Sequence, residues 1–211
     1  MDKKIIIFDL DGTLVDTRAF VIKSLNELSM SFNYERLDEI NIRKLRGTRS
    51  IYFLRALGVP IWKGPKLIRC IQKKLSKEIA NLSFVPGLSD VLLRLKKDGN
   101  TLGVATSNST KNMNLFFEKY EGRFFDFKKA NIFAFGKHRA LRRIGKEQGV
   151  DLKNIYYVGD ETRDIIAAKK AGVHVIAVTW GFNNREILST LNPDYIADSP
   201  EEISLFLQSQ S

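Results

Sequence analysis

Short apolar runs alternate with amphipathic segments along most of the chain. The first run, Lys4 to Leu10, is rich in isoleucine and ends at Asp11-Gly12, which is typical of a buried parallel strand that leads into a tight turn. Similar runs follow, the last two weaker than the others: Thr101–Thr106, Ile155–Gly159, Val173–Val178, Asn131–Ala134 and Tyr195–Ala197. Each of these runs predicts one strand.

Apolar residues at helical spacing fill the segments between the runs. We expect helices at Leu88–Asp98, Ser109–Lys119, Lys137–Gln148, Thr162–Ala171 and Glu201–Leu207. Alternation of strand and helix predicts an α/β fold, a doubly wound parallel sheet with a Rossmann-like core and helices on both faces. Ligands of such sheets bind at the carboxyl ends of the strands.

The stretch between Thr17 and Leu82 departs from this alternation, because it contains helical patterns and no convincing strand. Phe84-Val85-Pro86-Gly87 then returns the chain to the alternating scheme. We therefore expect a small all-helical cap, residues 17–82, inserted after the first strand. The core would comprise residues 1–16 and 83–211.

Two carboxylates follow the first predicted strand. Asp9 and Asp11 are two positions apart in Phe8-Asp9-Leu10-Asp11-Gly12-Thr13, so on an extended segment both side chains point the same way. Like charges that close together require a cation or a shared proton. A hard divalent ion with oxygen ligands meets the first requirement, and an acid and base pair of different pKa meets the second.

Polar residues also follow the second predicted strand. Thr106, Ser107 and Asn108 could cradle a phosphate with hydroxyl, amide and backbone N–H groups at the start of a helix. A helix cap is the commoner meaning of such a sequence. Lys137, just before a later helix, could bring an ammonium group to a phosphate oxygen or a carboxylate.

A second acidic group, Asp160, Glu161 and Asp164, follows the strand that ends at Gly159. Asp160 alone could cap the next helix, but the group is richer in acid than a cap needs. The loop Trp180-Gly181-Phe182 lies at the same predicted edge of the sheet. It either walls a site there or packs against the core.

Four of these motifs carry a family resemblance: the Asp9 and Asp11 pair, the segment that starts at Thr106, Lys137, and the acidic group that starts at Asp160. In this order they resemble the haloacid dehalogenase superfamily over nearly the whole chain, and within it the phosphoglycolate phosphatase-like branch. The resemblance implies that Asp9 is the nucleophile and that Asp11 protonates the leaving oxygen and then activates water. Thr106 and Lys137 would bind the transferring phosphoryl group, with Ser107 and Asn108 beside them.

The same resemblance implies a magnesium ion. Asp9, the backbone carbonyl of Asp11, and Asp160 would hold Mg²⁺, and Glu161 and Asp164 would lie at or just beyond its first coordination shell. The helical insertion occupies the position of the family's mobile cap, which closes over small substrates.

The expected function is a Mg²⁺-dependent phosphatase that hydrolyses a small phosphorylated metabolite, phosphoglycolate-like or a sugar phosphate, through an aspartyl-phosphate. Asp11 favours phosphate esters, because the dehalogenases, phosphonatases and ion pumps of the superfamily are expected to lack an acid there. A phosphomutase or phosphotransferase on the same fold is the alternative. The histidines, His138 and His174, lie outside the cap, which weakens the mutase alternative.

Charge is concentrated in the predicted cap. The chain has a formal net charge of +10, and residues 17–82 hold 14 Lys plus Arg against 5 Asp plus Glu, a balance of +9. Solvated helix faces are the commoner source of such an excess, and attraction of anionic substrates is the alternative. We expect Arg46 and Arg49 to contact a second anionic group of the substrate when the cap closes.

Two rival functions come from other classes. A basic nucleic-acid-binding protein with a retired core is disfavoured, because the chain has no zinc-finger spacing or basic-region heptads and keeps its acidic motifs. A regulatory protein with a structural metal site stays open.

Cys70, the single cysteine, fits a reducing compartment, and Ile5–Phe8 is too short an apolar stretch for a signal peptide or a membrane span. We expect a cytoplasmic protein with no membrane partner, a monomer by default with a homodimer left open.

Overall fold

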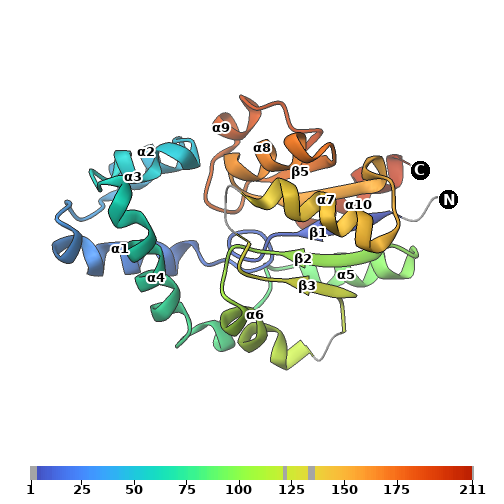
Figure 1. Ribbon diagram of the computed structural model, residues 1–211, viewed down its shortest axis with the longest axis horizontal. Coiled ribbons are helices and arrows are strands. Elements are labelled where there is room, and N and C mark those ends of the chain that lie inside the picture. Colours follow the sequence, from blue (N-terminus) through green and yellow to red (C-terminus); the bar gives the residue numbers. More distant parts are fainter. Residues whose placement is uncertain (1–3, 121–122, 133–135, 211) are drawn as a thin grey trace.

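One parallel sheet forms the centre of the structure (Figure 1), a computed structural model that describes residues 4–120, 123–132 and 136–210. Its strands are β1 (Ile5–Phe8), β2 (Thr101–Ala105), β3 (Phe127–Lys129), β4 (Ile155–Gly159), β5 (His174–Val178) and β6 (Tyr195–Ala197). Their order is β3-β2-β1-β4-β5-β6, and each neighbouring pair is parallel. The predicted doubly wound α/β fold is confirmed.

Helices cover both faces of this sheet (Figure 1). They are α5 (Leu88–Lys97), α6 (Thr110–Phe117), α7 (Lys137–Gln148), α8 (Thr162–Ala171), α9 (Arg185–Ser189) and α10 (Pro200–Ser209), with short 3-10 helices η4 (Glu118–Tyr120) and η6 (Leu152–Asn154). Side chains alternate along β1, so that Ile6 and Phe8 pack in one cluster with α5, α6 and α10, and Ile5 and Ile7 pack in another with α7 and α8. The sequence did not predict α9.

The third strand was predicted at the wrong place. It lies at Phe127–Lys129, whereas Asn131 and Ile132 are outside any strand and positions 133 and 134 fall outside the described residues. Asn131 has a φ of 58°, a left-handed conformation that cannot continue a strand. The N–H groups of Asn131 and Ile132 instead donate to the carbonyls of Asn108 and Thr106, which holds this segment against the end of β2.

The chain between β1 and α5 is helical in the structure. Its elements, called the cap segment below, are α1 (Arg18–Phe32), α2 (Glu39–Arg46), η1 (Ser50–Tyr52), α3 (Phe53–Ala56), η2 (Ile61–Lys63), α4 (Gly64–Leu75) and η3 (Ile79–Asn81). Most of them contribute to a separate hydrophobic cluster that includes Leu25, Phe32, Leu45 and Leu67, whereas Leu75 and Ile79, at the end of the segment, pack in the cluster of the core. The carboxyl end of β1 faces these helices (Figure 1).

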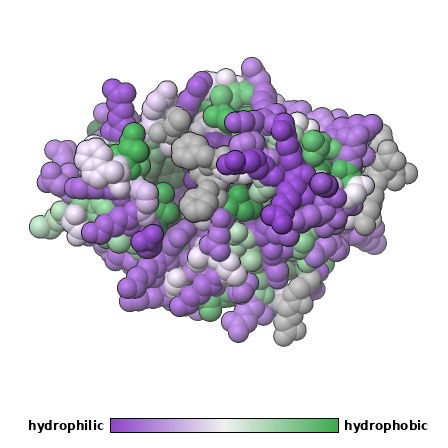
Figure 2. Space-filling view, viewed as in Figure 1, coloured by the Kyte–Doolittle hydropathy of each residue, from purple (hydrophilic) through white to green (hydrophobic). Residues whose placement is uncertain are grey.

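Many basic side chains of the cap segment are exposed, as solvated helix faces require: Arg43, Lys44, Lys66, Arg69, Lys73 and Lys77. Figure 2 shows hydrophilic side chains over most of one face of the molecule, with hydrophobic ones scattered between them. Among the described residues, every helix is too short or too polar to cross a lipid bilayer.

Candidate active site

Asp9 lies at the carboxyl end of the central strand. Its backbone N–H donates to the carbonyl of Val158 on β4, at 2.9 Å, and its Oδ1 accepts the N–H of Leu10, at 2.8 Å. Because β1 is hydrogen-bonded on both sides, by β2 and β4, the backbone that carries this carboxylate is fixed. The side chain is almost fully buried, with 3% of the residue exposed.

Lys137 joins two of the predicted acidic residues. It is the first residue of α7, is 1% exposed, and its Nζ lies 2.8 Å from Asp9 Oδ2 and 2.6 Å from Asp164 Oδ1. Burial by itself would lower the pKa of Lys137, but the charges of Asp164 and Asp9 outweigh it and hold this pKa well above its usual value. A permanent positive charge therefore lies beside the predicted nucleophile.

Asp160 is held by a close packing of loops. Its Oδ1 accepts the hydroxyl of Thr13 at 2.9 Å, and its Oδ2 accepts the N–H of Phe182 at 2.7 Å. A Cβ added to Gly12 would lie 2.3 Å from Asp160 Oδ2, and one added to Gly181 would lie 2.2 Å from Asp160 Cβ. Glycine at both positions therefore allows the two loops to approach this carboxylate.

The loop Trp180-Gly181-Phe182 lies next to Asp160 and also packs against the core through Trp180. The indole N–H of Trp180 donates to the carbonyl of Thr13 at 3.0 Å, next to Asp11-Gly12. The ring of Phe182 packs edge-on against Phe53 of the cap segment, with centroids 5.4 Å apart. This loop thus contacts both Asp160 and the cap segment.

Three carboxylates come close enough to share a cation. Oxygen atoms of Asp9, Asp160 and Asp164 all lie within 4.8 Å of one another. Burial raises the pKa of Asp160 and of Asp164, and neighbouring carboxylates raise both further, despite the opposing charge of Lys137 on Asp164. The negative charge of these carboxylates exceeds that of their counter-ions, and their oxygen atoms are the ligands that hard divalent cations prefer.

Asp164 differs from the other two acids in its partners. Its Oδ1 accepts from Lys137, and its Oδ2 accepts the backbone N–H of Glu161 at 3.1 Å, so both oxygens already have a donor. That geometry agrees with a place at the margin of a metal site. Glu161, which is partly exposed, pairs with Arg163.

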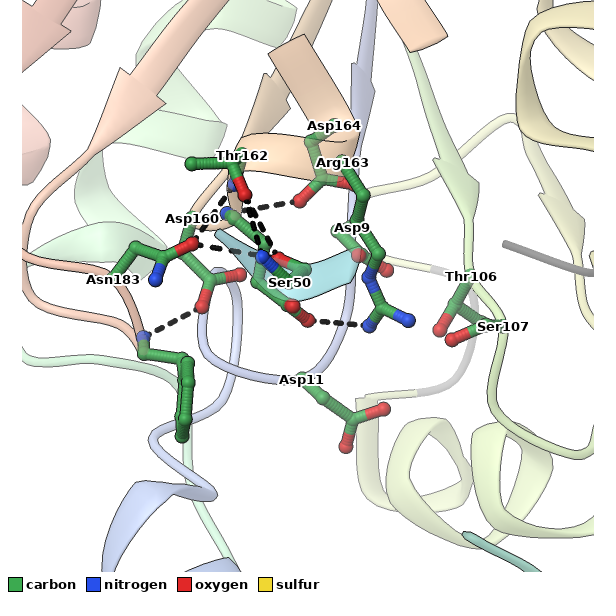
Figure 3. A network of polar contacts seen from close by, with 12 residues as sticks. Asp9, Asp11, Ser50, Thr106, Ser107, Asp160, Thr162, Arg163, Asp164 and Asn183 are labelled. Carbon is green, nitrogen blue, oxygen red and sulfur yellow. Dashed lines mark hydrogen bonds and ion pairs between the residues drawn. The ribbon is translucent and has the colours of Figure 1, made fainter. Parts of the chain in front are cut away.

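Asp11 lies apart from this cluster, on the side of α6, and is partly exposed (Figure 3). Burial and then the charge of Asp9 raise the pKa of Asp11 to about 7, while hydrogen bonds from the side chain of Asn108 oppose the rise. A carboxyl with this pKa exchanges a proton near neutral pH, which suits an acid that also acts as a base. The charge of Asp9 thus affects the pKa of Asp11, but the two side chains have different partners: Asp9 pairs with Lys137, and Asp11 accepts hydrogen bonds from Asn108.

The segment after β2 only partly matches the predicted phosphate cradle. The N–H of Asn108 donates to Thr106 Oγ1 at 3.0 Å, and the N–H of Ser109 donates to Asn108 Oδ1 at 2.7 Å, so two backbone donors are used within the loop. The side-chain amide of Asn108 faces Asp11. Thr106 Oγ1 accepts this bond from Asn108, so its hydroxyl can still act as a donor, and Ser107 lies beside it (Figure 3).

The structure brings in residues that the sequence analysis missed. Thr162, at the start of α8, accepts the N–H of Ser50 at 2.9 Å, and its own N–H donates to Asn183 Oδ1 at 2.9 Å. The amide of Asn183 donates to the carbonyls of Arg46 and Thr48, each at 3.0 Å. This network joins the cap segment to the edge of the acidic cluster (Figure 3). The position of Asn183 next to the Trp180 loop was the one available signal.

The two cap arginines have different surroundings. Arg46 Nε donates to the carbonyl of Phe182 at 3.1 Å and its Nη2 to that of Thr179 at 3.4 Å, so its guanidinium binds a loop of the core. Arg49 is exposed. In this arrangement Arg46 joins the two parts of the molecule, whereas Arg49 is the one of the pair whose side chain is solvated.

Comparison with known proteins agrees with this geometry. A family model described as haloacid dehalogenase-like hydrolase matches residues 6–178. The phosphoglycolate phosphatase of Synechococcus elongatus is 35% identical over 199 residues, which cover 94% of each chain. That of Vibrio parahaemolyticus is 27% identical and covers 96% of this chain and 95% of its own. A predicted phosphatase from Clostridium acetobutylicum has the same fold, with a TM-score of 0.80 at 23% identity over 98% of this chain and 99% of that one.

Proposed function

The chain belongs to the haloacid dehalogenase-like hydrolase family, and from that premise we propose that it is a phosphatase acting through an aspartyl-phosphate on Asp9. One observation carries the proposal. The buried Asp9 carboxylate lies 2.8 Å from Lys137 Nζ and within 4.8 Å of carboxylate oxygens of Asp160 and Asp164. A phosphoryl group needs this combination, because its charge must be neutralised while a nucleophile attacks in line.

In the first step, an oxygen of Asp9 attacks phosphorus and the ester bond breaks. Asp11 donates its proton to the leaving oxygen, and the pKa of about 7 allows it to be protonated when substrate binds. Lys137 and the hydroxyl of Thr106 bind the phosphoryl oxygens. In the second step, Asp11 takes a proton from water, which attacks phosphorus and releases inorganic phosphate and free Asp9.

The donor set suits Mg²⁺, which would be held by Asp9, the backbone carbonyl of Asp11, and Asp160. When bound, this ion neutralises charge on the phosphoryl oxygens during transfer. Asp164 would fix Lys137 and the backbone of Glu161 rather than bind the ion directly, because both of its oxygens already accept bonds.

We propose a small phosphorylated metabolite as substrate, phosphoglycolate-like in its size and charge. Support comes from the curated relatives that carry the name phosphoglycolate phosphatase and match the chain over more than nine-tenths of its length. We further propose that residues 17–82 act as a cap over a core of residues 1–16 and 83–211. The separate hydrophobic cluster of the cap segment supports this division.

The test is release of phosphate from p-nitrophenyl phosphate and then from a panel that includes phosphoglycolate and sugar phosphates. We expect release with Mg²⁺, loss of release with EDTA, and a fall of at least about 1,000-fold in Asp9→Asn. Asp98→Asn, an exposed acid at the end of α5, is the matched control and should retain activity. Turnover that survives Asp9→Asn would contradict the mechanism, and a wild type inactive on every substrate would contradict the function.

A further inference from the structure

Arg163 extends its charged end into the site. It is the second residue of α8, and its side chain points from that helix toward Asp9 and toward the side where Thr106 and Ser107 lie (Figure 3). The charges of Glu161, Asp164, Asp9 and Asp160 together outweigh the effect of burial and raise the pKa of Arg163. Two of these acids, Asp9 and Asp164, also pair with Lys137.

The contacts of Arg163 leave part of its donor capacity unused. Its Nη2 forms an ion pair with Glu161 Oε1, the residue just before α8. Its Nε is buried and has no hydrogen-bond partner among the described residues. A guanidinium carries five N–H donors in a planar fork, and an unpaired buried donor is costly. An anion with several acceptor atoms would satisfy these donors.

Lys137 cannot supply all the bonds that a phosphoryl group requires. An ammonium group has three donors, and two of those on Lys137 point to Asp9 and Asp164. The hydroxyl of Tyr157 competes for the third, so at most one donor is left for a group that bears three oxygens and two negative charges. A second cation on the same side of Asp9 would complete the set, and guanidinium binds phosphate oxygens in pairs.

We propose that Arg163 binds the phosphoryl group being transferred, together with Lys137 and Thr106, and that its pair with Glu161 is the position it holds before substrate enters. This inference rests on the proposed phosphatase function. It adds a phosphate ligand from the segment after β4, which the sequence analysis connected only with the metal. A guanidinium that served only as a counter-ion of the acids would be replaced fully by the ammonium group of Arg163→Lys, whereas one that binds phosphate oxygens in pairs would be replaced only in part.

The test compares Arg163→Gln with Arg143→Gln. Arg143 lies on α7, is exposed, and pairs with Glu147 just as Arg163 pairs with Glu161, so it is a matched control outside the site. We expect Arg163→Gln to raise the inhibition constant of inorganic phosphate at least about tenfold and to lower kcat/KM for p-nitrophenyl phosphate by about 100-fold. Arg163→Lys should recover part of this loss, because it restores the charge without the fork. Arg143→Gln should match the wild type.

The substrate series separates the transferred group from a second anionic group. If Arg163 binds the transferred phosphoryl, the loss in kcat/KM is equal for ethyl phosphate and for phosphoglycolate, which carries a carboxylate as well. A loss confined to phosphoglycolate would overturn the proposal, and so would an Arg163→Gln variant with unchanged inhibition constant and kcat/KM. Circular dichroism and the melting temperature establish that each variant is folded.

Failure of this inference is distinguishable from failure of the phosphatase function. A wild type without Asp9-dependent release of phosphate would overturn the function itself. An active wild type whose kinetic constants are matched by Arg163→Gln would overturn only the role of Arg163.

Discussion

The side-chain amide of Asn108 donates to both carboxylate oxygens of Asp11, at 3.1 Å and 2.9 Å. Its orientation is fixed, because Asn108 Oδ1 accepts from the N–H of Ser109 and from the amide of Asn112 at 2.9 Å. The same Asn112 amide donates to the carbonyl of Gln72 on α4, at 3.0 Å. A chain of hydrogen bonds thus leads from the cap segment to the predicted acid.

Asn108→Ala should shift the pH profile of the enzyme. The amide stabilises the ionised form of Asp11 and lowers its pKa, so its removal raises this pKa, by about one unit for one bond to a charged group. An aryl phosphate has a good leaving group and needs Asp11 mainly as an ionised base. The acid limb of kcat against pH should therefore move to higher pH.

The control for this shift is Asn114→Ala, an exposed amide on the same helix, α6. Its profile should superimpose on that of the wild type. An acid limb that stays in place in Asn108→Ala would show that the hydrogen bonds do not set the proton affinity of Asp11.

Metal-free protein should lose stability as pH rises. Burial raises the pKa of Asp11, to about 7, and also raises that of Asp160 and of Asp164. The folded state then binds protons more tightly than the unfolded state, so the free energy of unfolding falls between the unfolded pKa of about 4 and the folded value. In EDTA, we expect a lower melting temperature at about pH 8 than at about pH 5, because the buried carboxylates are then ionised and Lys137 balances only part of their charge.

Mg²⁺ should reverse this loss. A cation that binds the folded state alone raises the melting temperature, and the rise should be larger at the higher pH, where no protons compete for the carboxylates. Differential scanning fluorimetry at both pH values measures it. Asp160→Asn should abolish most of the Mg²⁺-dependent rise; an undiminished rise in that variant would place the ion elsewhere.

Gly12→Ala should damage the site more than the fold. Gly12 has a φ of +76° and its added Cβ would lie 2.3 Å from Asp160 Oδ2, whereas Gly87 has a φ of +82° and open space around it. Alanine at either position costs about 1–2 kcal/mol of backbone strain. Only Gly12→Ala should displace Asp160, with a loss of activity of about 100-fold.

Melting temperature and the Mg²⁺ dependence of activity, measured on Gly12→Ala and Gly87→Ala, separate the two effects. Similar melting temperatures with a higher Mg²⁺ requirement in Gly12→Ala alone are the expected result. Equal activity in the two variants would mean that Asp160 tolerates displacement.

Arg46→Gln and Arg49→Gln should differ in their effect on substrates. Arg46 binds the carbonyls of Phe182 and Thr179, so its loss weakens the contact between the cap segment and the core and should raise KM for every substrate several-fold. Arg49 is exposed, so we expect its loss to matter only for substrates with a second anionic group.

Steady-state kinetics with phosphoglycolate and ethyl phosphate measure both variants. A loss with Arg46→Gln that is specific to phosphoglycolate would instead favour the direct substrate contact expected from the sequence for both arginines. No change in either variant would exclude a kinetic role for this pair.

The sequence by itself determined the sheet and the edge at which the chemistry lies. Apolar runs of strand length follow a local period, and carboxylates that come directly after them must lie at the carboxyl ends of parallel strands. For this reason Asp9 and Asp160 could be placed at this edge before their distances were known, whereas the role of Lys137 was expected from the family resemblance. The misplaced third strand shows the limit of the local pattern, because the left-handed backbone of Asn131 has no hydrophobic signal.

Only the tertiary structure decided how the polar groups are shared. By sequence, the side chain of Asn108 could bind either phosphate or Asp11. Its orientation toward Asp11 depends on a hydrogen bond from Asn112, on α6, which in turn donates to the carbonyl of Gln72, on α4 of the cap segment. Arg163 lies inside the acidic motif from Asp160 to Asp164, but the sequence does not show where its guanidinium points or which acid it pairs with. Hydrogen bonds and ion pairs form only when atoms of distant segments lie about 3 Å apart, with a tolerance of a few tenths of an ångström, and periodicity carries no such information.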